Sequence, residues 1–375
     1  MKDSSEIQIP VLVPQVPEPA LWTDLLKKSF EAARFSNGGP LAKIAEQEIS
    51  NHLGGSCEVM VCASNTSGLI ASLMAFECRS KKVLVSNYTY AATLNAIHCA
   101  GAIPVLSDVD PLTWEISVEQ IMKAQSEFPD IHTVLITRVH GFIRDIEAVL
   151  DYCNAHGLKV VIDAAAAFPG DKGGYRTRLD VVEVFSFHAT KPLGIGEGGA
   201  VVGDVLTMAA VRRASNFGLD SLNESFGDGL NAKMDEFAAA RLIAALNSFS
   251  DYVQERRKFA NELYAIFANS AAVKLPTQTE NTSWPFFPIK FRNLKDLLTF
   301  QEDLFLVAQT RRYYYPSMSE GYIGKGETLR TLSLDVSLEL AATSLCLPVI
   351  PSLERKNQER YFNKICAMVK SLPEN

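Results

Sequence analysis

The sequence predicts an α/β protein with a three-layer core, in which helices cover both faces of a mostly parallel sheet. Short apolar runs alternate with helical stretches from residue 58 to residue 204, and this alternation is typical of parallel sheets. Glycine or aspartate stands at the ends of many of these runs. With 375 residues, 47% of them hydrophobic and 21% charged, the chain has enough apolar material for a buried core and for two domains.

Each predicted element rests on a local pattern. Residues 41–54 carry apolar side chains at helical spacing and end at a glycine, which predicts a helix. Helices are also predicted at about 66–78, 91–101 and 145–157. Apolar runs predict strands at 58–63, 81–86, 103–110, 133–141, 158–166, 181–187 and 199–204.

The alternation fades after about residue 235. A long helical stretch at roughly 234–269 leads into a mixed segment that contains WPFFPIKF and RRYYYP. We therefore expect a large domain over residues 1–235 and a smaller C-terminal α/β domain over residues 236–375. Ligands of such sheets bind at the carboxyl ends of the strands, so the chemistry is expected there.

Composition excludes several classes of function. The formal net charge is −7, which disfavours nucleic acid and anionic membranes as partners. No apolar run approaches the ~18 residues of a membrane span, and the N-terminus lacks a signal-peptide pattern, so a cytoplasmic protein is expected. The seven cysteines contain no CxxC motif and the six histidines are scattered, which predicts reduced thiols and no metal site.

Residues 184–202, VFSFHATKPLGIGEGGAVV, carry the strongest chemical signal. An apolar strand leads to Lys191, which is followed by a glycine-rich loop. A buried lysine with a lowered pKa acts as a Schiff-base nucleophile; the alternative is an ordinary surface lysine. The loop also contains GxGxxG, but a strand follows it instead of a helix, which disfavours a dinucleotide site.

Three further segments carry weaker signals. Asp163 ends the apolar run LKVVID and is either a turn residue or an acid facing a cationic ring nitrogen. The turn before residues 66–78 is rich in Ser and Thr, which indicates either a helix cap or a phosphate site. Tyr90 opens a predicted helix and serves either core packing or stacking on a flat cofactor.

These segments, taken together and in this order, resemble the DegT/DnrJ/EryC1/StrS family of nucleotide-sugar aminotransferases. The resemblance covers nearly the whole chain, from FSNGGPLAKIAEQEISNHLG through SFHATKPLGIGEGGAVV to GLNAKMDEFAAA and CLPVIPSL. It implies the fold-type-I architecture of pyridoxal-phosphate (PLP) enzymes. It also implies a homodimer with shared active sites.

The resemblance assigns roles residue by residue. Lys191 would bind the cofactor covalently and act as general base and acid, and Asp163 would pair with the ring nitrogen. Thr66, Ser67 and Ser186 would hold the cofactor phosphate, with Asn231 reaching in from the other subunit. Tyr90 would stack on the ring. The candidate substrate residues are His188, Arg311, Arg312 and Tyr314.

The chain departs from the family pattern at three positions. The family usually has Gln where Ala166 stands and His where Phe168 stands, so one hydrogen bond beside the cofactor ring is missing or comes from elsewhere. Lys233 replaces the usual Arg of the GLNAKMDE block. Family relatives that dehydrate sugars carry His in place of the lysine, so Lys191 argues against dehydration.

The implied reaction transfers an amino group from L-glutamate to a nucleotide-linked ketosugar. FSNGGPL and TRRYYYPS most resemble the branch that acts on dTDP-4-keto-6-deoxyhexoses, which predicts a 4-aminotransferase acting on dTDP-4-keto-6-deoxy-D-glucose for polysaccharide, O-antigen or glycoside biosynthesis. The alternatives are amination of a 3-keto or another nucleotide-linked sugar, and a non-catalytic PLP- or sugar-nucleotide-binding relative.

Overall fold

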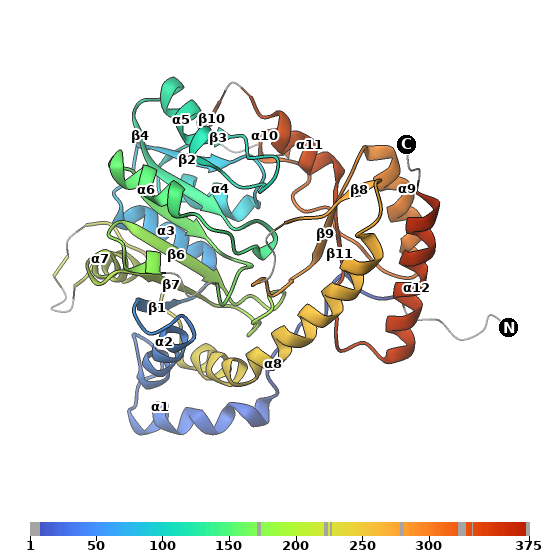
Figure 1. Ribbon diagram of the computed structural model, residues 1–375. Coiled ribbons are helices and arrows are strands. Elements are labelled where there is room, and N and C mark those ends of the chain that lie inside the picture. Colours follow the sequence, from blue (N-terminus) through green and yellow to red (C-terminus); the bar gives the residue numbers. More distant parts are fainter. Residues whose placement is uncertain are drawn as a thin grey trace.

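The computed structural model describes residues 8–170, 174–220, 224–225, 227–277, 281–321, 328–331 and 333–372. Within these residues the strands form two sheets, of eight and three strands, and helices pack against both (Figure 1). In this part of the chain, no helix has the length and apolar character that crossing a bilayer requires.

The larger sheet is mostly parallel, as predicted. Its strand order is β1-β7-β6-β5-β4-β2-β3-β10, and β7 runs antiparallel to both of its neighbours. The carboxyl ends of the parallel strands therefore meet at one edge of the sheet. The strands are β1 (Glu58–Cys62), β2 (Lys82–Ser86), β3 (Ile103–Ser107), β4 (Ile131–Thr137), β5 (Lys159–Asp163), β6 (Val181–Ser186), β7 (Gly199–Gly203) and β10 (Leu329–Arg330).

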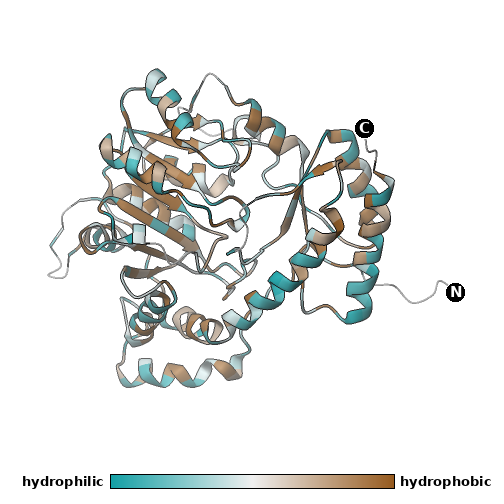
Figure 2. Ribbon diagram, viewed as in Figure 1, coloured by the Kyte–Doolittle hydropathy of each residue, from teal (hydrophilic) through white to brown (hydrophobic). Residues whose placement is uncertain are grey.

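Helices cover both faces of this sheet because alternate strand residues point to opposite sides. Val161 packs in one apolar cluster, whereas its neighbours Val160 and Ile162 pack in another. One face is covered by α3 (Asn65–Ala75), α4 (Ala91–Cys99) and α7 (Val205–Ser215). The other is covered by α2 (Pro40–His52), α5 (Val118–Glu127), α6 (Glu147–Ala155) and the first half of α8 (Glu236–Phe267). Figure 2 shows the apolar residues concentrated in the strands between these layers.

The smaller sheet is antiparallel, with order β11-β9-β8. Its strands are β8 (Val273–Lys274), β9 (Phe287–Phe291) and β11 (Ser344–Leu347). Its apolar core includes residues of α8, α9 (Leu294–Phe305), α11 (Asp335–Thr343) and α12 (Arg355–Ser371). The short elements are η1 (Pro19–Leu21), η2 (Thr23–Leu26), α1 (Lys27–Glu31), η3 (Val139–Gly141), η4 (Gly174–Thr177) and α10 (Met318–Gly321).

The two sheets are linked by α8, whose first half packs in the larger core and whose second half packs in the smaller core. The chain crosses between them elsewhere as well. Ile9 pairs with Ala308, and β10, which follows α10, adds to the larger sheet beside β3. The domain division at residue 235 stays a prediction.

Glu236, at the start of α8, joins three helices. Its fully buried carboxylate accepts hydrogen bonds from the Ser29 hydroxyl at 2.8 Å and from the backbone amides of Leu41 at 2.8 Å and Ala42 at 2.9 Å. Those two amides belong to the first turn of α2, where no intrahelical acceptor exists. A carboxylate at a helix N-terminus also complements the helix dipole.

Candidate active site

A cavity of about 390 Å³ lies between the two sheets, at the carboxyl ends of β4, β5 and β6. One side includes the first turn of α3, the residue before α4, and the loops after β5 and β6. The facing side comes from the C-terminal half of the chain. The lining includes Thr66, Tyr90, Asp163, Ser186, His188 and Lys191 on the first side and Pro285, Phe286, Arg311, Tyr313 and Tyr314 on the second.

Asp163 is the last residue of β5, and its buried carboxylate is held by three donors. The Thr93 hydroxyl donates to Oδ2 at 2.7 Å, while the Asn65 amide and the Ala165 backbone N–H each donate to Oδ1 at 3.2 Å. Burial raises the pKa of Asp163, and these donors and the charge of Lys191 oppose that rise. The carboxyl group of Asp163 is therefore held in a fixed orientation in the cavity wall, where it can contact a bound ligand.

The first turn of α3 lies beside this carboxylate. Asn65 donates a second hydrogen bond to the Val184 carbonyl of β6 at 3.0 Å, which ties α3 to the sheet. Ser64 and Ser67 form a reciprocal capping box. The Ser67 hydroxyl donates to the Ser64 carbonyl within this cap. Thr66 lines the cavity, whereas Ser67 does not.

Lys191 lies in the loop that follows β6. Its backbone N–H bonds the His188 carbonyl at 2.8 Å, and Ala189 bonds Gly196 at 2.8 Å, so the loop is tightly folded. A Cβ at Gly194 would lie 2.7 Å from the Ala189 carbonyl oxygen, which explains one of the glycines that follow the lysine. Burial lowers the pKa of Lys191, and Asp163 opposes this shift. A lysine whose neutral amine is favoured suits nucleophilic and general-base chemistry.

His188 has partners that the sequence analysis did not identify. Its Nδ1 lies 2.8 Å from the Thr190 hydroxyl and its Nε2 lies 3.6 Å from a Glu197 oxygen. Thr190 and Glu197 also line the cavity. Glu197 could have been found from the sequence, because it is the acidic residue of the GEGG stretch that follows Lys191.

The departures at residues 166 and 168 have different structural settings. Ala166 lines the cavity, and the loops after β4 and β5 are so close that a Cβ at Gly141 would lie 2.3 Å from the Ala166 carbonyl oxygen. Phe168 is buried in an aromatic cluster with Phe185 and Phe249, at ring distances of 5.2 and 5.3 Å. The aromatic side chain at position 168 therefore contributes to the core.

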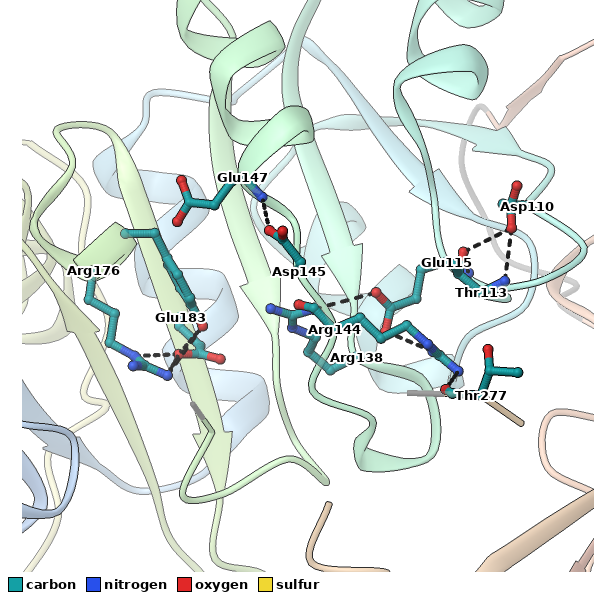
Figure 3. A network of polar contacts seen from close by, with 11 residues as sticks. Asp110, Thr113, Glu115, Arg138, Arg144, Asp145, Glu147, Arg176, Glu183 and Thr277 are labelled. Carbon is teal, nitrogen blue, oxygen red and sulfur yellow. Dashed lines mark hydrogen bonds and ion pairs between the residues drawn. The ribbon is translucent and has the colours of Figure 1, made fainter. Parts of the chain in front are cut away.

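A buried ionic network joins Arg138, which lines the cavity, to Glu115 and Arg144 (Figure 3). Glu115 lies 3.5 Å from both Arg138 and Arg144, and Arg144 donates to the Thr277 carbonyl at 3.3 Å. Burial raises the pKa of Glu115, and the two guanidinium groups counteract it. The backbone N–H of Arg138 bonds the Asp163 carbonyl at 2.9 Å, so the network is connected to the backbone of the acid at the end of β5.

The remaining predicted residues are distributed as follows. Arg311 and Tyr314 line the cavity, as does the previously unassigned Tyr313. Arg312 lines an adjoining cavity of about 240 Å³ and donates to the Ala342 carbonyl at 2.8 Å. Asn231 lines neither cavity; it is exposed and pairs with Asn216.

This donor set fits pyridoxal phosphate. The amine of Lys191 could bind the cofactor's aldehyde, and the buried carboxylate of Asp163 could pair with its ring nitrogen. The N-terminus of α3, with Thr66 and Ser186, could bind its phosphate. The fold and the cavity together define a fold-type-I PLP-dependent enzyme.

Comparison with known proteins identifies the family. Residues 22–366 match the DegT/DnrJ/EryC1/StrS aminotransferase family, and the chain belongs to it. A transaminase of dTDP-4-amino-4,6-dideoxy-D-glucose from Shigella dysenteriae is 27% identical over 90% of this chain and 93% of the relative.

Solved structures agree with this assignment. DesI, crystallised in the presence of its TDP-sugar product, superposes with a TM-score of 0.83 at 26% identity, over 97% of this chain and 94% of DesI. A PLP-dependent aminotransferase from Bacillus cereus superposes with a TM-score of 0.85 at 24% identity, over 96% and 100% of the two chains. The protein is an aminotransferase with PLP as its cofactor.

Proposed function

We propose that the protein transfers the amino group of L-glutamate to carbon 4 of dTDP-4-keto-6-deoxy-D-glucose. The observation that carries the proposal is the two-sided cavity, with Lys191 and Asp163 on one wall and Arg311, Tyr313 and Tyr314 on the other. The name of the Shigella dysenteriae relative and the TDP-sugar product of DesI support a dTDP-linked 4-amino sugar as the product.

When bound, PLP would supply an electron sink and a carbonyl group that can accept and donate the amino group. The chain's own groups hold it and move protons. Asp163 would keep the ring nitrogen protonated, and Thr66 and Ser186 would hold the phosphate beside the start of α3. The Ser67 hydroxyl, expected from the sequence to share this role, is used within the cap of α3 instead. The Lys191 amine takes the proton from the substrate carbon and returns it as general base and acid, because burial favours its neutral form.

The facing wall carries the groups for the nucleotide part of the substrate. The Arg311 guanidinium lies 4.7 Å from the centre of the Tyr313 ring and lines both the main cavity and the adjoining one. Arg312 stacks on Tyr315 at 3.6 Å. A diphosphate requires cationic partners with several donors, and arginine supplies them. His188 and Tyr314 would contact the sugar.

We also propose that the protein is a homodimer. Aromatic side chains are exposed near the start of the chain and of α8, where Phe30, Phe35 and Phe237 are 65%, 38% and 43% exposed. The rings of Phe30 and Phe35 are 4.9 Å apart, and those of Phe35 and Phe237 are 6.3 Å apart, so they form one patch. Asn231 would reach the phosphate of the partner's cofactor. Light scattering of the purified protein should give a mass of about twice 41.2 kDa.

The test of the proposed function separates the two half-reactions. Glutamate alone should convert the yellow PLP form to the pyridoxamine form, and dTDP-4-keto-6-deoxy-D-glucose should restore it with formation of the 4-amino sugar. A panel of dTDP-, UDP- and GDP-linked 3- and 4-ketosugars then identifies the substrate. A spectrum that ignores every amino donor would instead indicate a non-catalytic binding protein.

A further inference from the structure

The substrate-facing wall rests on a buried stretch of irregular backbone. Residues 282–286 form no helix or strand, yet Thr282, Ser283 and Trp284 are almost fully buried. Trp284 has φ of +50°, and a proline follows it, so this stretch cannot pair as a regular strand. Its carbonyl groups therefore need hydrogen-bond donors from elsewhere in the protein.

Arg256 of α8 supplies those donors. Its Nε bonds the carbonyls of Ser283 and Trp284, both at 3.0 Å, and its Nη2 bonds the Pro285 carbonyl at 3.0 Å. Nη2 also contacts the Trp284 carbonyl, and Nη1 donates to the Tyr252 hydroxyl at 2.8 Å. One planar guanidinium thus fixes three consecutive carbonyl groups, which a single ammonium group could not match in geometry.

The charge of Arg256 has no carboxylate partner among the residues that the structure describes. Burial lowers its pKa, with only the Tyr252 hydroxyl opposing that shift. An unpaired buried charge is costly for stability, and an apolar residue of similar volume would avoid that cost. The buried guanidinium of Arg256 offsets this cost by holding the backbone of residues 283–285 in one geometry.

The segment fixed by Arg256 leads directly to the candidate substrate residues. Phe286 packs against Tyr313 with ring centres 4.9 Å apart, and the Arg311 guanidinium lies over the Tyr313 ring, 4.7 Å from its centre. Tyr313 is also held from the large domain, because the Tyr88 hydroxyl donates to its carbonyl at 2.9 Å. The wall is therefore fixed from two independent sides.

We propose that Arg256 is a positioning residue for sugar-nucleotide recognition, which holds the Pro285–Phe286 wall so that Tyr313 and Arg311 keep their places in the cavity. This inference rests on the proposed function. Arg256 lines neither the main cavity nor the adjoining one, so it acts on the substrate only through the wall. Loss of its donors should weaken binding of the large sugar nucleotide and spare the cofactor and the small amino donor.

The test compares Arg256→Met, Arg256→Lys and the control Arg257→Met. Arg257 bonds the Thr282 and Asn281 carbonyls at 3.1 and 2.8 Å, at the far end of the same stretch. Arg256→Met should raise KM for the sugar nucleotide about tenfold, the effect of losing one or two buried donors. The rate of the glutamate half-reaction and the affinity for PLP should stay within about twofold. Arg256→Lys should recover part of the loss, and Arg257→Met should resemble the wild type.

A second variant keeps the inference testable if Arg256→Met does not fold. Tyr88→Phe removes the hydroxyl that fixes the Tyr313 carbonyl from the other side and that also lies 3.0 Å from His140 Nε2 in the cavity lining. This variant should raise the same KM about threefold or more. A folded Arg256→Met protein with unchanged KM for the sugar nucleotide would overturn the inference. So would an equal loss in the glutamate half-reaction, or unchanged KM in both Arg256→Lys and Tyr88→Phe. If the wild-type protein aminates no ketosugar, the proposed function itself fails.

Discussion

Thr93 provides a direct way to weaken the acid of the site without changing its shape. Its hydroxyl donates to Asp163 Oδ2 at 2.7 Å, and both residues are buried. Thr93→Val replaces the hydroxyl by a methyl group of nearly the same volume. A hydrogen bond to a charged group contributes about 1.5–3 kcal/mol, so its loss should raise the pKa of Asp163 further above its usual range.

The expected result is a weaker complex with the cofactor. Burial already raises the pKa of Asp163, so a further rise favours the neutral acid and removes its attraction for the protonated ring nitrogen. The same 1.5–3 kcal/mol corresponds to an increase in Kd for PLP of about ten- to 150-fold. Titration of the cofactor-free protein with PLP, followed by absorbance or tryptophan fluorescence, measures this Kd.

Thr89→Val is the matched control. The Thr89 hydroxyl lies 3.0 Å from that of Thr93 and 2.8 Å from that of Thr137, one step away from the acid. Its loss should change Kd less than about threefold, since Thr93 keeps its bond to Asp163. The reasoning is refuted if Thr93→Val binds PLP as the wild type does, or if the two variants weaken binding equally.

Two further predictions concern stability. Glu236→Ala leaves the Leu41 and Ala42 amides and a buried hydroxyl without their acceptor, so urea denaturation should show a free energy of unfolding lower by about 3 kcal/mol; a loss below about 1 kcal/mol would contradict the role of this carboxylate. Burial raises the pKa of Asp163 in the folded state above its unfolded value of about 4. Below about pH 4 the carboxyl is protonated in both states and its ionisation does not affect the free energy of unfolding. As pH rises from there through the folded-state pKa, ionisation lowers that free energy. Cofactor-free Asp163→Asn should therefore have a higher Tm than the wild type at pH 7 and no advantage below about pH 4; a lower Tm at pH 7 would be inconsistent with this sign.

The parallel core could be predicted from the sequence because its signals are local. Each buried strand is a short apolar run, and most of the helices between the strands begin or end at a recognisable residue. The predicted run at 158–166 was too long, since β5 ends at Asp163. Its strand pairing ends there because the chain turns to bring Ala165 and Ala166 into the cavity wall.

Two helices of the core were not predicted. In α5 only Ile121 and Ala124 are buried, but a capping box formed by Ser117 and Gln120 marks its start and could have been recognised from the sequence. The start of α7 also carried a signal, because Asp204 accepts hydrogen bonds from the amides of Leu206 and Thr207 as an N-cap. An aspartate that follows an apolar run and precedes VLTMAAV could have been recognised from the sequence.

The parts of the site that the sequence could not predict depend on contacts between distant residues. Glu115, Arg138 and Arg144 look like ordinary charged residues in the sequence, and only the fold buries them together beside the cavity. Arg256 lies on a helical stretch, and nothing local indicates that it bonds carbonyls 27 to 29 residues further along the chain. Such partners are determined by the packing of α8 between the two sheets.

The central claim is that the amine of Lys191 is the group to which PLP is covalently joined. Borohydride reduction of the PLP-loaded protein, followed by digestion and mass spectrometry of the peptides, tests it directly. The account predicts a pyridoxyl group on Lys191 alone. Recovery of the label on another lysine, or no labelled peptide at all, would contradict it.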